Sequence, residues 1–156
     1  MLDDNHLLTW FLTHGALPDA PTDSGRTALD VAAWTTSLGV LEQLLQHGGT
    51  IGRTNALHMA VRSPNSGRRE VIEYLLEAGA NIDAIEYAGV ESREGRPDLG
   101  TALHYAAQNG REDLVHLLIG RGANTEIRDT SGRTALEVAK TAHPQLVPAL
   151  SLAKRV

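Results

Sequence analysis

The sequence predicts an all-α fold built from stacked pairs of short helices. Leucine and alanine supply 42 of the 156 residues, whereas aromatic residues make up only 4%. This composition suits thin stacked helices better than a β-sandwich, which needs β-branched and aromatic residues. Two sequence patterns also occur four times each along the chain. Since one short helix pair cannot bury its apolar face alone, repeated units of this kind must stack on one another.

The shorter pattern predicts the first helix of each unit. It consists of a Thr or Asn, the dipeptide Ala-Leu and a further alanine, and its copies begin at Thr27, Asn55, Thr101 and Thr134. A Thr or Asn side chain can cap the first N–H groups of a helix, and small alanines let a neighbouring helix approach closely. We therefore expect a short helix after each of these four residues.

The longer pattern predicts the second helix of each unit. Two apolar residues, two others and two further apolar residues are followed at a fixed distance by Gly15, Gly48, Gly79 and Gly122. Apolar residues at i, i+1, i+4 and i+5 lie on one stripe of a helix. The glycine suits the left-handed conformation in which many helices end.

The spacing of the copies carries a family resemblance. Thr101 and Thr134 are 33 residues apart, which is the period of ankyrin repeats. The segment GTALHYAAQNGREDLVHLLIGRGANTEIRDTSGRTAL, which begins at Gly100, resembles one repeat of that family almost throughout. The resemblance extends over nearly the whole chain. It implies an ankyrin-repeat solenoid, in which helix–turn–helix repeats are joined by β-hairpin or loop fingers.

We expect one ankyrin-repeat domain over residues 1–156. Its parts are an N-terminal half-repeat that serves as a cap (1–22), repeat 1 (23–51), repeat 2 (52–84), a long finger with repeat 3 (85–127) and a C-terminal capping repeat (128–156).

The connections between the repeats differ in length. Asn55 lies seven residues after Gly48, too close for a full hairpin, whereas Thr101 lies 22 residues after Gly79. Three extra residues separate the two helices of repeat 2, within 62–69. Long loops often carry function. We therefore expect the 83–100 loop to fold over the notch left by the short finger and to determine specificity.

The composition of the chain excludes several classes of function. A net charge of −5 argues against a nucleic-acid partner, and the absence of cysteine excludes disulfides, thiolate nucleophiles and Cys-based zinc sites. The seven histidines lack metal-ligand spacing, and no glycine-rich phosphate-binding motif occurs, so we expect neither a metal nor a cofactor. With an acidic start and no apolar run of membrane-spanning length, the chain is expected to be intracellular, cytoplasmic or nuclear, and not bound to a membrane.

One set of residues permits a catalytic interpretation. The third position after each cap holds Asp30, His58, His104 and Glu137, and stacking would place them in a row. A histidine beside carboxylates can act as a general base. The family resemblance instead implies a structural role for His58 and His104, which bond within their turn and to the next repeat. We therefore expect a protein that is not an enzyme, while Asp30 and Glu137 depart from the family motif.

The resemblance implies a protein-interaction module that binds through its concave face and fingers. Positions seven and eight after the caps, together with finger residues, give the expected contacts Arg26, Trp34, Thr35, Arg62, Gln108, Asn109 and Arg133. The long loop adds Tyr87, Arg93 and Arg96. Trp and Arg often dominate interface energies. For Trp34, packing beneath a neighbouring loop is an equal alternative to partner contact.

Two other functions stay open. The first is a small-molecule or catalytic site in the notch, which would use Asp30, His58 or His104 with Tyr87. The second is self-association through the incomplete N-terminal cap, where apolar side chains crowd one short helix: Leu7, Leu8, Trp10 and Phe11. The expected state is therefore a monomer or a weak homodimer.

Overall fold

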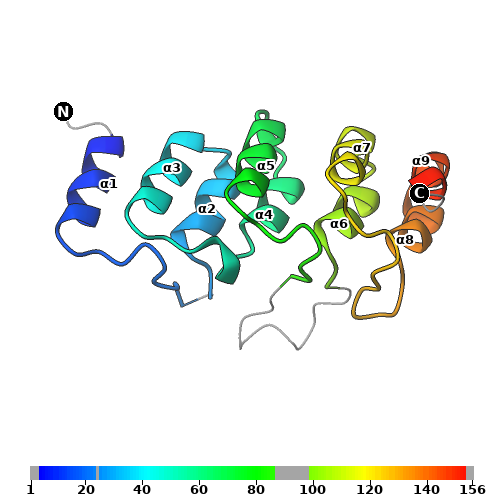
Figure 1. Ribbon diagram of the computed structural model, residues 1–156, viewed down its shortest axis with the longest axis horizontal. Helices are drawn as coiled ribbons and strands as arrows, with labels where there is room; N and C mark the ends of the chain where they lie inside the picture. Colours follow the sequence, from blue (N-terminus) through cyan, green and yellow to red (C-terminus); the bar gives the residue numbers. More distant parts are fainter. Residues whose placement is uncertain (1–3, 24, 87–98, 154–156) are drawn as a thin grey trace. The chain divides into compact units, whose positions relative to one another are not determined.

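The computed structural model describes residues 4–23, 25–86 and 99–153 (Figure 1). Within these ranges the secondary structure consists of nine α-helices and two short 3₁₀ helices. An isolated antiparallel β-bridge joins Arg128 and Thr134. The predicted all-α fold of paired helices is confirmed. The chain divides into two compact units, Met1–Ala80 and Asn81–Val156, which are described separately below.

The first unit contains five α-helices in two layers. They are α1 (Asp4–Thr13), α2 (Ala28–Thr35), α3 (Leu38–Gln46), α4 (Ala56–Arg62) and α5 (Arg68–Glu77), with the 3₁₀ helix η1 (Ile51–Arg53) before α4. α2 packs against α3 and α4, and α3 also contacts α1 and α5 (Figure 1). The core between the layers is made of leucine and isoleucine side chains that are almost fully buried: Leu29, Leu41, Leu44, Ile72 and Leu75.

The second unit repeats this arrangement. It contains α6 (Ala102–Gln108), α7 (Glu112–Gly120), α8 (Ala135–Ala142), the 3₁₀ helix η2 (Pro144–Leu146) and α9 (Val147–Ala153). α6 packs against α7 and α8, while α9 contacts α7 and α8. Its almost fully buried leucines are Leu103, Leu114, Leu118, Leu146 and Leu150. None of the described helices has both the length and the apolar composition that a membrane span requires.

The predicted caps explain where most of the first helices begin. The Thr27 hydroxyl accepts the Asp30 N–H at 3.3 Å, and the Asp30 carboxylate accepts the Thr27 N–H at 2.9 Å. Thr134 and Glu137 form the same reciprocal pair, at 3.3 and 2.8 Å. Both pairs satisfy N–H groups that a helix start leaves without an intrahelical acceptor.

The expected side-chain cap at Asn55 is wrong. Its φ and ψ are −93° and 19°, not the extended angles of Thr27, and α4 starts without a capping hydrogen bond from the Asn55 side chain. A cap residue needs extended backbone to aim its side chain at the helix start. The short connection, which contains η1, brings the chain to Asn55 in a turn-like conformation instead.

The connections follow the predicted lengths. η1 takes the place of a hairpin before α4, and five residues (63–67) join α4 to α5, whereas only Thr36 and Ser37 join α2 to α3. We call residues 63–67 the insertion. Of the 83–100 loop, only the two ends are described. The expected contacts Tyr87, Arg93 and Arg96 lie outside the described residues.

Candidate functional site

The histidines and carboxylates that suggested general-base chemistry are mostly buried. Asp30 and His58 are each 2% exposed and His104 is 4% exposed, because all three lie in the first turns of helices that pack inside their units. Glu137 is exposed and serves as a cap. Buried side chains of this kind are not accessible to a substrate. In the described residues, no group of three or more metal-binding side chains is arranged to hold a metal ion.

His104 links its own helix to the next finger. Its Nδ1 accepts the backbone N–H of Thr101 at 3.2 Å, so the ring proton resides on Nε2, which donates to the Arg133 carbonyl at 2.9 Å. Burial lowers the pKa of His104, although the Arg133 carbonyl partly offsets this effect. The ring is therefore neutral near pH 7. These bonds confirm the structural role that the resemblance implied for this histidine.

Asp30 occupies the position in α2 that His104 occupies in α6, but its side chain accepts hydrogen bonds where that of His104 donates one. Burial raises the pKa of its carboxyl group, and hydrogen bonds from the Thr27 backbone and the Asn55 backbone lower the pKa in part. Since a carboxylate only accepts hydrogen bonds, Asp30 binds N–H groups where His104 donates to a carbonyl. Both side chains stabilise the start of a helix.

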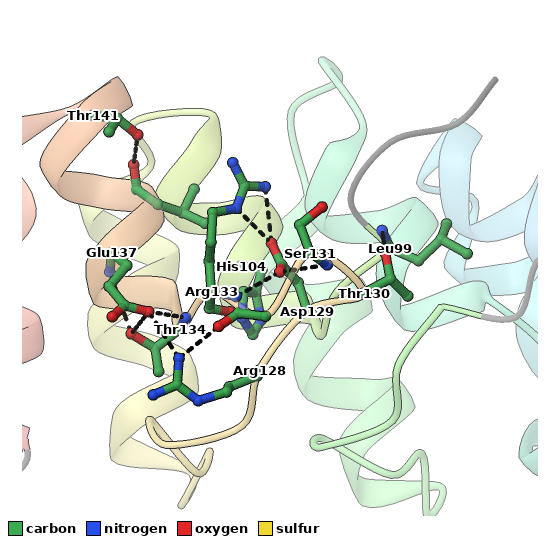
Figure 2. Close-up of polar contacts among 12 residues, drawn as sticks. Leu99, His104, Arg128, Asp129, Thr130, Ser131, Arg133, Thr134, Glu137 and Thr141 are labelled. Carbon is green, nitrogen blue, oxygen red and sulfur yellow. Dashed lines mark hydrogen bonds and ion pairs between the residues drawn. The ribbon is translucent and has the colours of Figure 1, made fainter.

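The finger before α8 is held by a network around Asp129 (Figure 2). Its Oδ1 accepts the backbone N–H groups of Ser131 and Arg133, at 3.0 and 2.8 Å. Its Oδ2 accepts Nε and Nη2 of Arg133, at 3.0 and 2.8 Å. Burial alone would raise the pKa of Asp129, but the bonds from Arg133 outweigh it and hold the pKa below its ordinary value. Arg133 is therefore fixed in place while its side chain stays 38% exposed.

Sequence reasoning missed a second arginine of this finger. Arg128 Nη1 donates to the Gly132 carbonyl and to Glu137 Oε2, the latter at 3.2 Å (Figure 2). Hydrogen bonds from Thr134, followed by the charge of Arg128, lower the pKa of Glu137. The sequence feature that could have indicated Arg128 is its position on the opposite side of the turn from Arg133. The finger thus presents two arginines, each beside a carboxylate.

Trp34 lies at the last turn of α2, and the insertion holds its backbone. The Trp34 carbonyl accepts the Ser63 hydroxyl at 2.6 Å and Asn65 Nδ2 at 3.1 Å. The indole itself is 40% exposed, and Val31, one turn earlier on the same face, is 48% exposed. The structure therefore combines features of both interpretations of Trp34, since the loop contacts its backbone while the ring reaches the surface.

The remaining expected contacts are divided between the units. Arg26 and Thr35 are exposed in the first unit, where Arg62 is half-buried at the end of α4. Gln108 and Asn109 are exposed at the end of α6 in the second unit. The structure thus brings Trp34, Thr35 and Arg62 to the same end of two packed helices.

The described ends of the long loop are anchored to the second unit. The Glu86 N–H donates to the Gly100 carbonyl at 3.0 Å, and the buried Glu86 carboxylate accepts the Tyr105 hydroxyl. Leu99 pairs with Thr130 through two hydrogen bonds of 2.9 Å. These contacts fix where the chain leaves and rejoins the helices.

The N-terminal helix exposes an aromatic cluster. Leu7, Trp10 and Phe11 are 46%, 51% and 50% exposed. The Trp10 ring stacks on His14 with centroids 4.1 Å apart and meets Phe11 edge to face at 5.3 Å. The His14 Nδ1 lies 2.7 Å from the Trp10 carbonyl, so this histidine caps the end of α1.

Comparison with known proteins agrees with this architecture. A family model described as ankyrin repeats in three copies matches residues 3–86 and 88–154. The chain is 31% identical over 137 residues to protein glp-1 of Caenorhabditis elegans and 34% identical over 138 residues to the B-cell lymphoma 3 protein homolog of Mus musculus; each match covers 82% of the chain. It is 40% identical over 70 residues, 45% of the chain, to the probable E3 ubiquitin-protein ligase XBOS34 of Oryza sativa. The matched parts make up 10%, 28% and 12% of these three relatives.

Proposed function

The chain belongs to the ankyrin repeat family, and from this membership we propose that it is a non-catalytic module that binds another protein. Ankyrin repeats are typically protein-interaction modules. The buried state of Asp30, His58 and His104 supports a role without catalysis. Some relatives carry enzyme names, such as the ligase from Oryza sativa, but the chain matches only 12% of that protein. The enzyme name therefore gives no reason to propose that activity for this chain.

The observation that carries the proposal is the exposed ring and the fixed backbone of Trp34. A large aromatic side chain that is 40% exposed, on a helix end whose carbonyl is held by two donors from another loop, is a preorganised anchor. Because the backbone at Trp34 is already held, binding through this side chain requires little further ordering of the backbone. Thr35 and Arg62 lie at the same end of the α2–α4 pair and extend the proposed contact.

The second unit supplies a further set of proposed contacts. Arg133 is fixed by Asp129, and Gln108 and Asn109 are exposed at the end of α6. Guanidinium groups held in one geometry lose little side-chain freedom on binding. Arg26 is included as the corresponding finger residue of the first unit.

The 83–100 loop is the proposed specificity element. Its anchored ends, at Glu86 and Leu99, would keep any contact it makes at a fixed place on the second unit. The spacing of 22 residues from Gly79 to Thr101, which includes this loop, is well above that of the other connections. The expected residues Tyr87, Arg93 and Arg96 belong to this part of the proposal.

Two wider expectations belong to the same proposal. The repeat boundaries given above divide one domain of residues 1–156, and the partner is a protein met inside the cell, in the cytoplasm or the nucleus. The net charge of −5 disfavours nucleic acid as that partner.

The test uses the whole chain as bait and follows one purified partner. Proteins captured from an extract with a zero-length crosslinker are identified by mass spectrometry, and the best candidate is then purified for titration by calorimetry. Trp34→Ala is compared with Leu152→Ala, which truncates another exposed apolar side chain, 66% exposed, in the second unit. A third variant replaces residues 88–97 with Gly and Ser, which retains Glu86 and Leu99.

Trp34→Ala should weaken binding by at least about tenfold, the usual effect of losing an aromatic anchor, and Leu152→Ala should leave binding unchanged. The loop variant should bind its partner less tightly. Equal affinities for all three variants would show that binding does not use these surfaces. Failure of the purified chain to bind any protein would refute the proposed function itself.

Self-association is the second candidate function, and the exposed cluster on α1 favours it. Three large apolar side chains of one helix are each about half exposed, and apolar patches of this kind mark contact sites. A second copy that covered α1 would bury Trp10 and Phe11.

A further inference from the structure

The clearest departure from local structural preference is at Thr36. Its φ is 57° and its ψ is 36°, and among the described residues it is the only non-glycine with a positive φ. A β-branched residue is strained in this left-handed region. Thr36 lies nine residues after Thr27, and the residue nine after Thr101 is Gly110, with φ 68°. The chain thus keeps a strained threonine where its own second unit uses glycine.

The insertion holds this strained residue. The Thr36 hydroxyl donates to the Ser66 carbonyl at 2.9 Å, while Ser63 and Asn65 bind the neighbouring Trp34 carbonyl. The insertion therefore contacts the end of α2 at two places, Trp34 in its last turn and Thr36 directly after it. Strain retained by surrounding contacts is characteristic of functional surfaces.

The charges around the insertion are unusual for this chain. Residues 62–69 carry three arginines and no carboxylate, although the net charge of the chain is −5. Arg68 and Arg69 are the first two residues of α5, where the helix dipole disfavours positive charge. In the second unit the corresponding helix α7 begins with Glu112 and Asp113, as the dipole prefers.

Neighbouring carboxylates compensate part of this charge. Glu70 and Glu73 follow on α5, and Glu73 pairs with Arg69 at 3.2 Å. Arg62 and Arg68 lie closer to the insertion, since Arg62 ends α4 and Arg68 donates its Nε–H to the Asn65 carbonyl at 3.0 Å. Positive charge therefore borders the insertion on both sides.

We propose that this corner, formed by Val31, Trp34, Arg62, the insertion and Arg68, docks an acidic segment of the partner protein that carries an apolar residue. The inference rests on the proposed protein-binding function and assigns the partner's chemistry at one place. The apolar residue contacts the exposed Val31 and Trp34 side chains, and the carboxylates approach Arg62 and Arg68. The finger of this repeat is shortened, and the insertion adds contact surface at the end of α4 instead.

The probe is a displayed library of random dodecapeptides selected on the immobilised whole chain. Selected peptides are synthesised and titrated against the wild type, Trp34→Ala and the double variant Arg62→Gln/Arg68→Gln. The matched control Arg121→Gln/Lys140→Gln removes the same charge from exposed residues of the second unit. Circular dichroism shows whether each variant keeps the wild-type helix content.

The expected peptides combine Asp or Glu with an apolar residue and bind less tightly as salt is raised. Trp34→Ala and Arg62→Gln/Arg68→Gln should each weaken binding by about tenfold or more, and the control pair should not. Peptides without an acidic excess, equal losses in the control, or selection of no peptide would each overturn this inference. The protein-binding proposal is judged separately by the purified partner, so the two failures are distinguishable.

Discussion

Replacement of Ser63 by alanine should destabilise the first unit by about 1–2 kcal/mol. Ser63 is fully buried, its hydroxyl donates to the Trp34 carbonyl at 2.6 Å, and its oxygen accepts the Asn65 N–H at 3.1 Å. The variant Ser63→Ala loses both bonds. A net hydrogen bond contributes about 1 kcal/mol, and the exposed Asn65 N–H can turn to water, so the total stays near the lower end of a two-bond loss.

The measurement is urea unfolding of the whole chain, followed by tryptophan fluorescence, because both tryptophans, Trp10 and Trp34, belong to the first unit. Ser66→Ala is the matched control from the same loop. Ser66 is exposed and contacts Thr36 through its backbone carbonyl, which the substitution retains. Its unfolding free energy should therefore change by less than about 0.5 kcal/mol.

A double-variant cycle tests whether Ser63 and Asn65 share one acceptor. In Asn65→Ala the Trp34 carbonyl keeps the Ser63 hydroxyl, whereas the double variant removes both side-chain donors. The combined loss should exceed the sum of the single losses by at least about 0.5 kcal/mol. Strict additivity, or equal losses in Ser63→Ala and Ser66→Ala, would refute the inferred contact between the insertion and α2.

Three further predictions concern other parts of the chain. Leu103→Ala should cost about 2–5 kcal/mol in urea unfolding because Leu103 is 1% exposed, and a loss well below 1 kcal/mol would contradict its packing. Because the pKa of His104 is lowered in the folded state, its contribution to the free energy of unfolding should be fully present above the ordinary pKa of 6.5. This contribution should decrease as the pH falls from 6.5 to the lowered folded pKa. This slope, at most about 1.4 kcal/mol per pH unit for one proton, should disappear in His104→Gln, and an equal slope in both proteins would exclude His104 as its source. Phe11→Asp should abolish any concentration-dependent mass in sedimentation, while a dimer that survives it would place the contact away from α1.

The helices were predictable from the sequence because their signals are local. The repeated Ala-Leu pattern after Thr27, Thr101 and Thr134 marks helix starts, and the reciprocal bonds of Thr27 and Thr134 place those starts as expected. The three extra residues after Arg62 were also countable from the repeat spacing. The local periodicity of the sequence was therefore sufficient to predict the order of the helices and the unequal lengths of the connections between them.

The contacts of the candidate site were not predictable, since they join residues far apart in sequence. Ser63 and Trp34 are 29 residues apart, and Tyr105 and Glu86 are 19 apart. A threonine at position 36 gives no sign of positive φ, because this conformation is usually signalled by glycine or asparagine. Such features depend on which repeats stack, and only the folded units reveal them.

Asp30 and His104 show how one position adapts to the connection that follows it. His104 donates to the Arg133 carbonyl, which the longer finger brings within 2.9 Å. In the repeat of Asp30 the connection is shorter, since Asn55 lies only seven residues after Gly48, and it offers the Asn55 backbone N–H rather than a carbonyl. A carboxylate can accept a hydrogen bond from this N–H group, whereas the Nε2–H of a histidine would face a second donor. The change from a donor to an acceptor side chain thus fits the shortened finger.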